Sequence, residues 1–135
     1  MHNVHRHEQE IAKTCIQACE ACIVACEALH DTSTSISTSS YEEEQRTEHC
    51  LQACNTCIKS LNNFSAALQK SRTACKDAAC RIDFEAYSAQ SDKTIKSCGK
   101  LAGLLKAAAQ DLKPILEEVI ADCDSTAELC EQFLQ

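Results

Sequence analysis

Glycine, proline and aromatic residues are scarce in this chain of 135 residues. It holds 2 glycines, 1 proline, 3 phenylalanines, 2 tyrosines and no tryptophan. So few turn-forming residues favour long helices with few connections. Alanine, leucine, glutamate, lysine and glutamine, which are plentiful, are good helix formers. The length suits one domain, residues 1–135, that is large enough to bury a single core.

Two further absences bear on where the protein resides. No run of apolar residues approaches the roughly 20 that are needed to cross a bilayer. Residues 1–7 contain no apolar signal-peptide core, which predicts a cytoplasmic protein. An exported protein without its leader would look similar. The formal net charge of −7 disfavours nucleic acid and anionic lipid as partners.

Apolar periodicity predicts four helices, at about residues 4–29, 41–70, 83–110 and 111–133. A loop rich in serine and threonine follows the first helix, and Ser40 with Glu43 predicts a capping box at the start of the second. Residues 71–82 are less regular and predict a connection with a turn of helix. Asp111 can cap the fourth helix, and Pro114 fits its first turn. These short connections predict an all-α fold, an antiparallel up-down-up-down four-helix bundle.

The predicted inward face of each helix is a stripe of residues three and four apart. Apart from cysteine, the stripes contain Val4, Glu8, Ile11, Leu29, Thr47, Leu61, Phe64, Leu68, Phe84, Tyr87, Ser91, Ile95, Leu101, Leu105, Ala108, Leu112, Leu116, Val119, Thr126 and Phe133.

Cysteine is abundant, with 12 residues, and most of these residues share the same inward stripes. At 100° per residue the four cysteines of the first helix fall within a band about 60° wide and roughly 16 Å long. The second helix repeats this phasing, with Leu61 in the fourth place. The row consists of Cys15, Cys19, Cys22, Cys26, Cys50, Cys54, Cys57, Cys98, Cys123 and Cys130, while Cys75 and Cys80 lie in the predicted connection.

Antiparallel packing predicts the level of each cysteine in the bundle. We expect Cys22 beside Cys50, Cys19 beside Cys54 and Cys15 beside Cys57, with Cys98 and Cys123 at mid-height and Cys130 near the lower end. Apolar residues are expected to close the sulfur zone above and below. The upper plug is predicted from Leu101, Leu105, Leu116 and Val119, and the lower from Leu61, Phe64, Leu68, Phe84 and Phe133.

Three roles for these thiols can be weighed. Cysteine can serve as a small core residue, but alanine or valine would pack without the risk of oxidation. Disulfides are rare in a cytoplasm, and Cys75 with Cys80 is the best candidate for a bonded pair. Metal binding explains the row directly, because soft thiolates select Cu(I), Zn(II) and iron–sulfur clusters. Zinc and iron–sulfur sites usually lie in loops, so Cu(I) is favoured, with several ions per chain.

In the cysteine spacing of the first and second predicted helices, the chain resembles the bacterial copper storage proteins, a family of cysteine-lined four-helix bundles. The resemblance implies that all ten cysteines of the row bind Cu(I), that the protein forms a homotetramer, and that it belongs to the cytosolic branch. A copper chaperone is one candidate for copper delivery. The third helix departs from the family pattern, since only Cys98 lines it, and Met1 is the only methionine. Cys75 and Cys80 remain open between metal binding and a disulfide.

Other features point to little further chemistry. His2, His5 and His7 crowd the N-terminus, either as a copper-loading site or as a solvated chain end. No grouping of nucleophile, base and orienting residue is present, so an enzyme is not expected. The alternative function is a zinc- or redox-responsive interaction protein. Binding of many Cu(I) ions, rather than one or two Zn(II), would distinguish the two.

Overall fold

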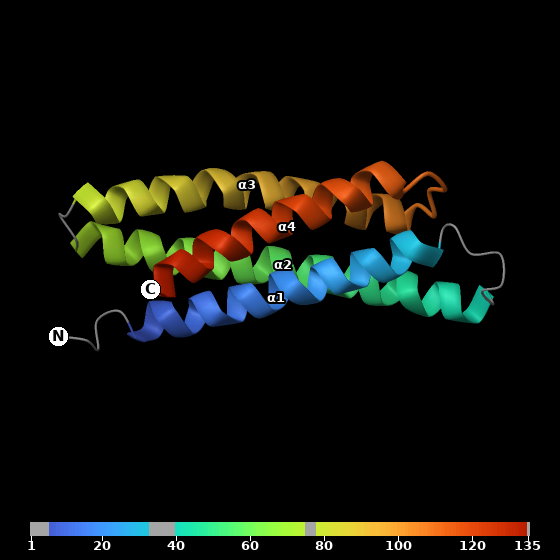
Figure 1. Ribbon diagram of the computed structural model, residues 1–135, viewed down its shortest axis with the longest axis horizontal. Helices are drawn as coiled ribbons and strands as arrows, with labels where there is room; N and C mark the ends of the chain where they lie inside the picture. Colours follow the sequence, from blue (N-terminus) through green and yellow to red (C-terminus); the bar gives the residue numbers. More distant parts are fainter. Residues whose placement is uncertain (1–5, 33–39, 75–77, 135) are drawn as a thin grey trace.

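The computed structural model describes residues 6–32, 40–74 and 78–134, and the side chains of residues 32, 71–74 and 78–83 lie outside this description. Four helices follow one another along the chain: α1 (Arg6–Thr32), α2 (Ser40–Ala74), α3 (Ala78–Lys106) and α4 (Lys113–Leu134). They lie side by side along the long axis of the molecule (Figure 1). None of the described helices is long and apolar enough to span a membrane.

The helices form a closed ring in which each one packs on two neighbours. α1 packs against α2 and α4, and α3 packs against the same two helices. Within the described residues no close backbone contact joins α1 to α3 or α2 to α4, so these pairs are diagonal. The predicted up-down-up-down four-helix bundle is therefore confirmed.

The predicted boundaries were wrong at the end of α2 and at both ends of α3. The segment 71–82 was expected to be a connection, yet α2 continues to Ala74 and α3 begins at Ala78. The third helix was expected to reach Gln110, but α3 ends at Lys106. Ala108 takes a left-handed φ of 54°, and the amides of Ala108 and Ala109 bond to the carbonyls of Leu105 and Leu104. These bonds are a Schellman ending, which alanine in place of the usual glycine made hard to detect in the sequence.

Most described residues of the predicted stripes are buried or half-buried, and Ala108 is exposed. Ala12 is fully buried where Ile11 was expected, and Thr94 is fully buried where Ile95 was expected; both isoleucines are half-buried. Ala108 is exposed because it lies beyond the end of α3. At the positions of Ala12 and Thr94 a small or polar side chain is fully buried in place of the isoleucine beside it. A prediction based on hydrophobicity alone therefore chose Ile11 and Ile95 as core residues in place of the adjacent Ala12 and Thr94.

Apolar and aromatic residues close the two ends of the core. At one end the Phe64 ring lies 4.8 Å from the Tyr87 ring and 5.4 Å from the Phe133 ring, both edge to face. The Tyr87 hydroxyl donates a hydrogen bond of 2.9 Å to the Leu61 carbonyl. Aromatic pairs in this geometry contribute about 0.5–1.5 kcal/mol each beyond the area they bury. The other end is filled by Leu101, Leu105, Leu116 and Val119, all buried.

Candidate metal centre

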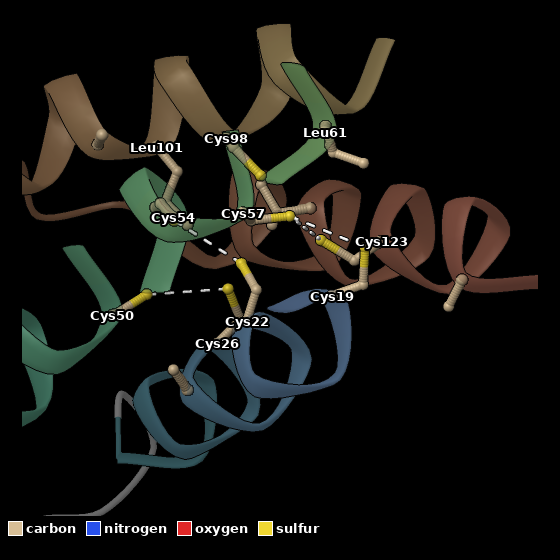
Figure 2. Close-up of a cluster of buried hydrophobic side chains, with 14 of the residues drawn as sticks. Cys19, Cys22, Cys26, Cys50, Cys54, Cys57, Leu61, Cys98, Leu101 and Cys123 are labelled. Carbon is tan, nitrogen blue, oxygen red and sulfur yellow. Dashed lines mark hydrogen bonds between the residues drawn. The ribbon is translucent and has the colours of Figure 1, made fainter. Parts of the chain in front are cut away.

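The ten cysteines of the predicted row all lie in the interior of the bundle. Each has a fully buried side chain, with a relative exposure of 0%, and each is a free thiol. The three- and four-residue spacing keeps the cysteines of one helix on a single face, so packing the helices brings their sulfurs together. Figure 2 shows the sulfurs of eight of them turned toward one another from all four helices.

Three rungs of paired sulfurs join α1 to α2. Sulfur-to-sulfur distances are 3.8 Å between Cys26 and Cys50, 3.9 Å between Cys22 and Cys54, and 3.9 Å between Cys19 and Cys57. The dashed lines of Figure 2 trace these rungs. The pairing corrects the predicted register, in which Cys22 faced Cys50, Cys19 faced Cys54 and Cys15 faced Cys57.

The register differs from the prediction because α2 begins further from the core than expected. Residues 41–45 of its first turns are exposed, and α2 extends past the end of α1 (Figure 1). These turns include charged glutamates, which gain nothing from burial. All pairs therefore shift by one cysteine along α1. Cys15 then faces no cysteine of α2, and its sulfur donates a hydrogen bond of 3.0 Å to the Ser60 carbonyl.

The remaining helices complete the sulfur zone at the expected height. The sulfurs of Cys57 and Cys123 lie 3.9 Å apart. Among the described residues, two groups of sulfurs lie close enough to share a metal ion, with all atoms of a group within 4.8 Å of one another. One group contains Cys22, Cys57, Cys98 and Cys123, and the other contains Cys22, Cys26 and Cys54.

Neighbouring thiols lower the pKa of some members of the row. Hydrogen bonds from Cys123 and Cys57 lower the pKa of Cys19 to about 5, against the opposing effect of burial. A hydrogen bond from Cys26 is the largest cause that lowers the pKa of Cys50 to about 4. Because the thiolate is the metal-binding form of cysteine, these sulfurs are prepared to bind a cation.

Other thiols hold their protons more tightly, since they donate to the thiolates. A hydrogen bond to Cys19 is the first cause that raises the pKa of Cys123, and one to Cys22 acts in the same way on Cys26. The pKa values of Cys54, Cys57 and Cys98 are raised as well. The row thus combines sulfurs whose pKa is lowered with sulfurs whose pKa is raised. A bound cation would take the place of the protons that they share.

A polar network between α3 and α4 lies beside the sulfur zone. The Thr94 and Thr126 hydroxyls are 2.7 Å apart, and they lie within hydrogen-bond distance of the Asp122 carbonyl, at 3.1 and 2.9 Å. The Asp122 carboxylate is buried and lies 3.6 Å from the ammonium of Lys93. Sequence reasoning found only Thr126 of this network. The spacing of Thr94 between Ser91 and Cys98 is the signal that could have revealed it.

The described histidines take no part in the sulfur zone. His7 is exposed, and His49 is exposed next to Cys50. His30 is half-buried, with its imidazole Nε2 at 3.9 Å from the Glu117 carboxylate. His2, His5 and Cys75 lie outside the described residues, as does the side chain of Cys80, so the predictions for them stay predictions.

Comparison of the chain with known protein families, with curated proteins and with solved structures finds no match in any of the three. The fold and the site are those of a cysteine-rich four-helix bundle whose core cysteines form groups that can hold metal ions.

Proposed function

We propose that this protein stores Cu(I), binding several ions per chain through the thiolates that line its bundle. The observation that carries the proposal is the continuity of the row. Ten buried free thiols occupy the core, and the pairs that link α2 to α1 and to α4 are 3.8–3.9 Å apart. Sulfurs at this spacing can bridge neighbouring ions, so each thiolate can serve more than one of them.

Ligand chemistry favours Cu(I) as the cargo. The donors are all sulfur, and soft thiolates select soft ions. The group of Cys22, Cys26 and Cys54 offers three sulfurs from only two helices, a number that suits Cu(I) better than tetrahedral Zn(II). The resemblance to copper storage proteins supports the same conclusion. It also supports the further parts of the proposal: a non-enzymatic role, a cytoplasmic location, a homotetramer, and delivery by a copper chaperone.

The surroundings of the row suit storage. Full burial keeps water and oxidants from the thiolates, which limits their loss to sulfenic and higher acids. The aromatic cluster of Phe64, Tyr87 and Phe133 closes one end, and Leu101, Leu105 and Val119 pack at the other. These residues allow the bundle to keep an apolar core when it holds no cargo.

Anaerobic titration of the fully reduced chain with Cu(I), against a strong chelator, tests the proposal. Uptake of several ions per chain is expected, and replacement of Cys50, Cys54 and Cys57 by serine should remove a large part of it. The Thr126→Val variant, which leaves every sulfur in place, is the matched control and should retain the full capacity. Uptake of fewer than about three ions by the unmodified chain would contradict storage, because bridged thiolates should hold more.

A zinc- or redox-responsive protein would behave differently in the same experiment. It would bind only one or two Zn(II) ions, or close specific disulfides on mild oxidation, with little capacity for Cu(I).

A further inference from the structure

One group of sulfurs draws a single cysteine from each of the four helices. Cys22 belongs to α1, Cys57 to α2, Cys98 to α3 and Cys123 to α4. Their sulfurs all lie within 4.8 Å of one another, and all four side chains are fully buried. Figure 2 shows Cys98 and Cys123 approaching Cys57 from the two helices that contribute least to the row.

The dimensions of this group fit a tetrahedral ion. With zinc–sulfur bonds of about 2.3 Å, a regular tetrahedron places its sulfurs about 3.8 Å apart. The sulfurs of Cys57 and Cys123 are already 3.9 Å apart, and no pair of the group needs to close by more than about 1 Å from its 4.8 Å limit. Side-chain rotation can supply such a change without movement of the helices.

We propose that Cys22, Cys57, Cys98 and Cys123 form a distinct four-thiolate site for one tetrahedral divalent ion of the Zn(II) type, which links all four helices at mid-height. This proposal is independent of the proposed Cu(I) storage. It requires only that four sulfurs can surround one ion, whereas storage requires that the whole row binds several ions. A divalent ion also offsets twice as much thiolate charge as Cu(I), which matters where four thiolates share a buried site.

This site accounts for the one cysteine that α3 contributes to the described core. The rungs between α1 and α2 make a row without α3, and α4 adds Cys130 as well as Cys123. Cys98 completes the only four-sulfur group found among the described residues. Its place at the height of Cys57 and Cys123, rather than elsewhere along α3, is what a tetrahedral site requires.

Anaerobic titration with Co(II), a spectroscopic substitute for Zn(II), tests the proposal on the full reduced chain. We expect the intense visible bands of a tetrahedral cobalt thiolate, saturating at one ion per chain. The Cys98→Ser variant should lose these bands, whereas Cys130→Ser, which removes a buried thiol outside the group, should retain them. Far-ultraviolet circular dichroism reports whether each variant keeps its helices.

X-ray absorption of the chain with one equivalent of Zn(II) provides a test that needs no variant. Four sulfur ligands are expected. Fewer than four sulfurs, or retention of the cobalt bands in Cys98→Ser, would overturn the four-helix site. A separate measurement of Cu(I) uptake distinguishes the two proposals. A chain that binds one Co(II) through four thiolates but little Cu(I) would support this site and contradict storage. A chain that binds several Cu(I) ions but gives no tetrahedral Co(II) spectrum would support storage and contradict this site.

Discussion

The two helical hairpins of this bundle are joined by different chemistry. Between α1 and α2 the facing core residues are cysteines, with sulfurs 3.8–3.9 Å apart. Between α3 and α4 they include Thr94 and Thr126, whose hydroxyls approach to 2.7 Å and share the Asp122 carbonyl. The same fold thus carries a row of thiols that could hold metal ions on one side and a hydrogen-bonded polar network on the other.

This difference predicts that one hairpin stabilises the metal-free bundle and that the other binds most of the metal. Thiols are weak hydrogen-bond donors, so the α1–α2 interface depends mainly on packing until a metal ion arrives. Hydroxyl-to-carbonyl bonds are stronger and directional, so the α3–α4 network can fix the alignment of its helices without metal. We infer that the α3–α4 network supports the metal-free bundle, while α1–α2 would supply most of the Cu(I) capacity under the proposed storage function.

Loading with Cu(I) should therefore stabilise the hairpins unequally, and this is the largest effect we expect. Each site saturated at about 1,000 times its Kd adds about 4 kcal/mol to the free energy of unfolding. Hydrogen exchange followed by mass spectrometry should show the stronger protection in α1 and α2. Equal slowing in all four helices would remove the proposed division.

High pH should destabilise the metal-free, reduced bundle. Folding raises the pKa of six thiols above the ordinary value of 9.0, and these are Cys26, Cys54, Cys57, Cys98, Cys123 and Cys130. Their contribution is complete below pH 9 and is lost as the pH rises above it, because the unfolded chain then binds fewer protons. The loss should be about 1.4 kcal/mol per pH unit for each thiol.

Urea unfolding at a series of pH values under anaerobic conditions measures this slope. The Cys98→Ala variant should show a smaller slope of the free energy of unfolding against pH, because one of the six thiols is missing. A free energy of unfolding that stays level between about pH 9 and 10 would show that the core thiols ionise as readily in the folded chain as in the unfolded one.

Removing the central hydroxyl of the α3–α4 network should have a smaller effect. Thr126→Val keeps the volume of the side chain but breaks its bonds to Thr94 and to the Asp122 carbonyl, and should cost about 1–2 kcal/mol. Ser125→Ala, at the exposed neighbouring position, should change stability by less than about 0.5 kcal/mol. Thermal unfolding of the metal-free proteins compares them, and equal stability of the two variants would mean that the network does not align α3 and α4.

The smallest expected effect comes from Lys93, which neutralises the buried Asp122 carboxylate from the surface. Its ammonium lies 3.6 Å from that carboxylate, but its side chain is 66% exposed, so solvent screens the pair. Lys93→Gln should cost less than about 1 kcal/mol, and Lys96→Gln, at an exposed position of the same helix, should cost less still. A loss above about 2 kcal/mol would show that the pair acts as a buried ion pair.

The sequence was sufficient to predict the four helices and the inward direction of ten cysteines, because periodicity reports directly on helix faces. It could not predict the α1–α2 register, which depends on how far the exposed first turns of α2 extend past α1. Thr94 was missed for a related reason. A hydroxyl becomes favourable in the core only when a partner such as Thr126 lies opposite, and single-helix patterns carry no such information.

Leu61 occupies a place in α2 with consequences for engineering. From Cys50 the α2 row advances by four, three and four residues to reach Leu61, which mirrors the steps from Cys26 back to Cys15 on α1. Leu61 is fully buried, and the Cys15 sulfur contacts the carbonyl of the adjacent Ser60. A cysteine introduced at position 61 would give Cys15 a sulfur partner and add a fourth rung between α1 and α2. Leu61 therefore ends the row of cysteines on α2 and separates it from the aromatic cluster of Phe64, Tyr87 and Phe133.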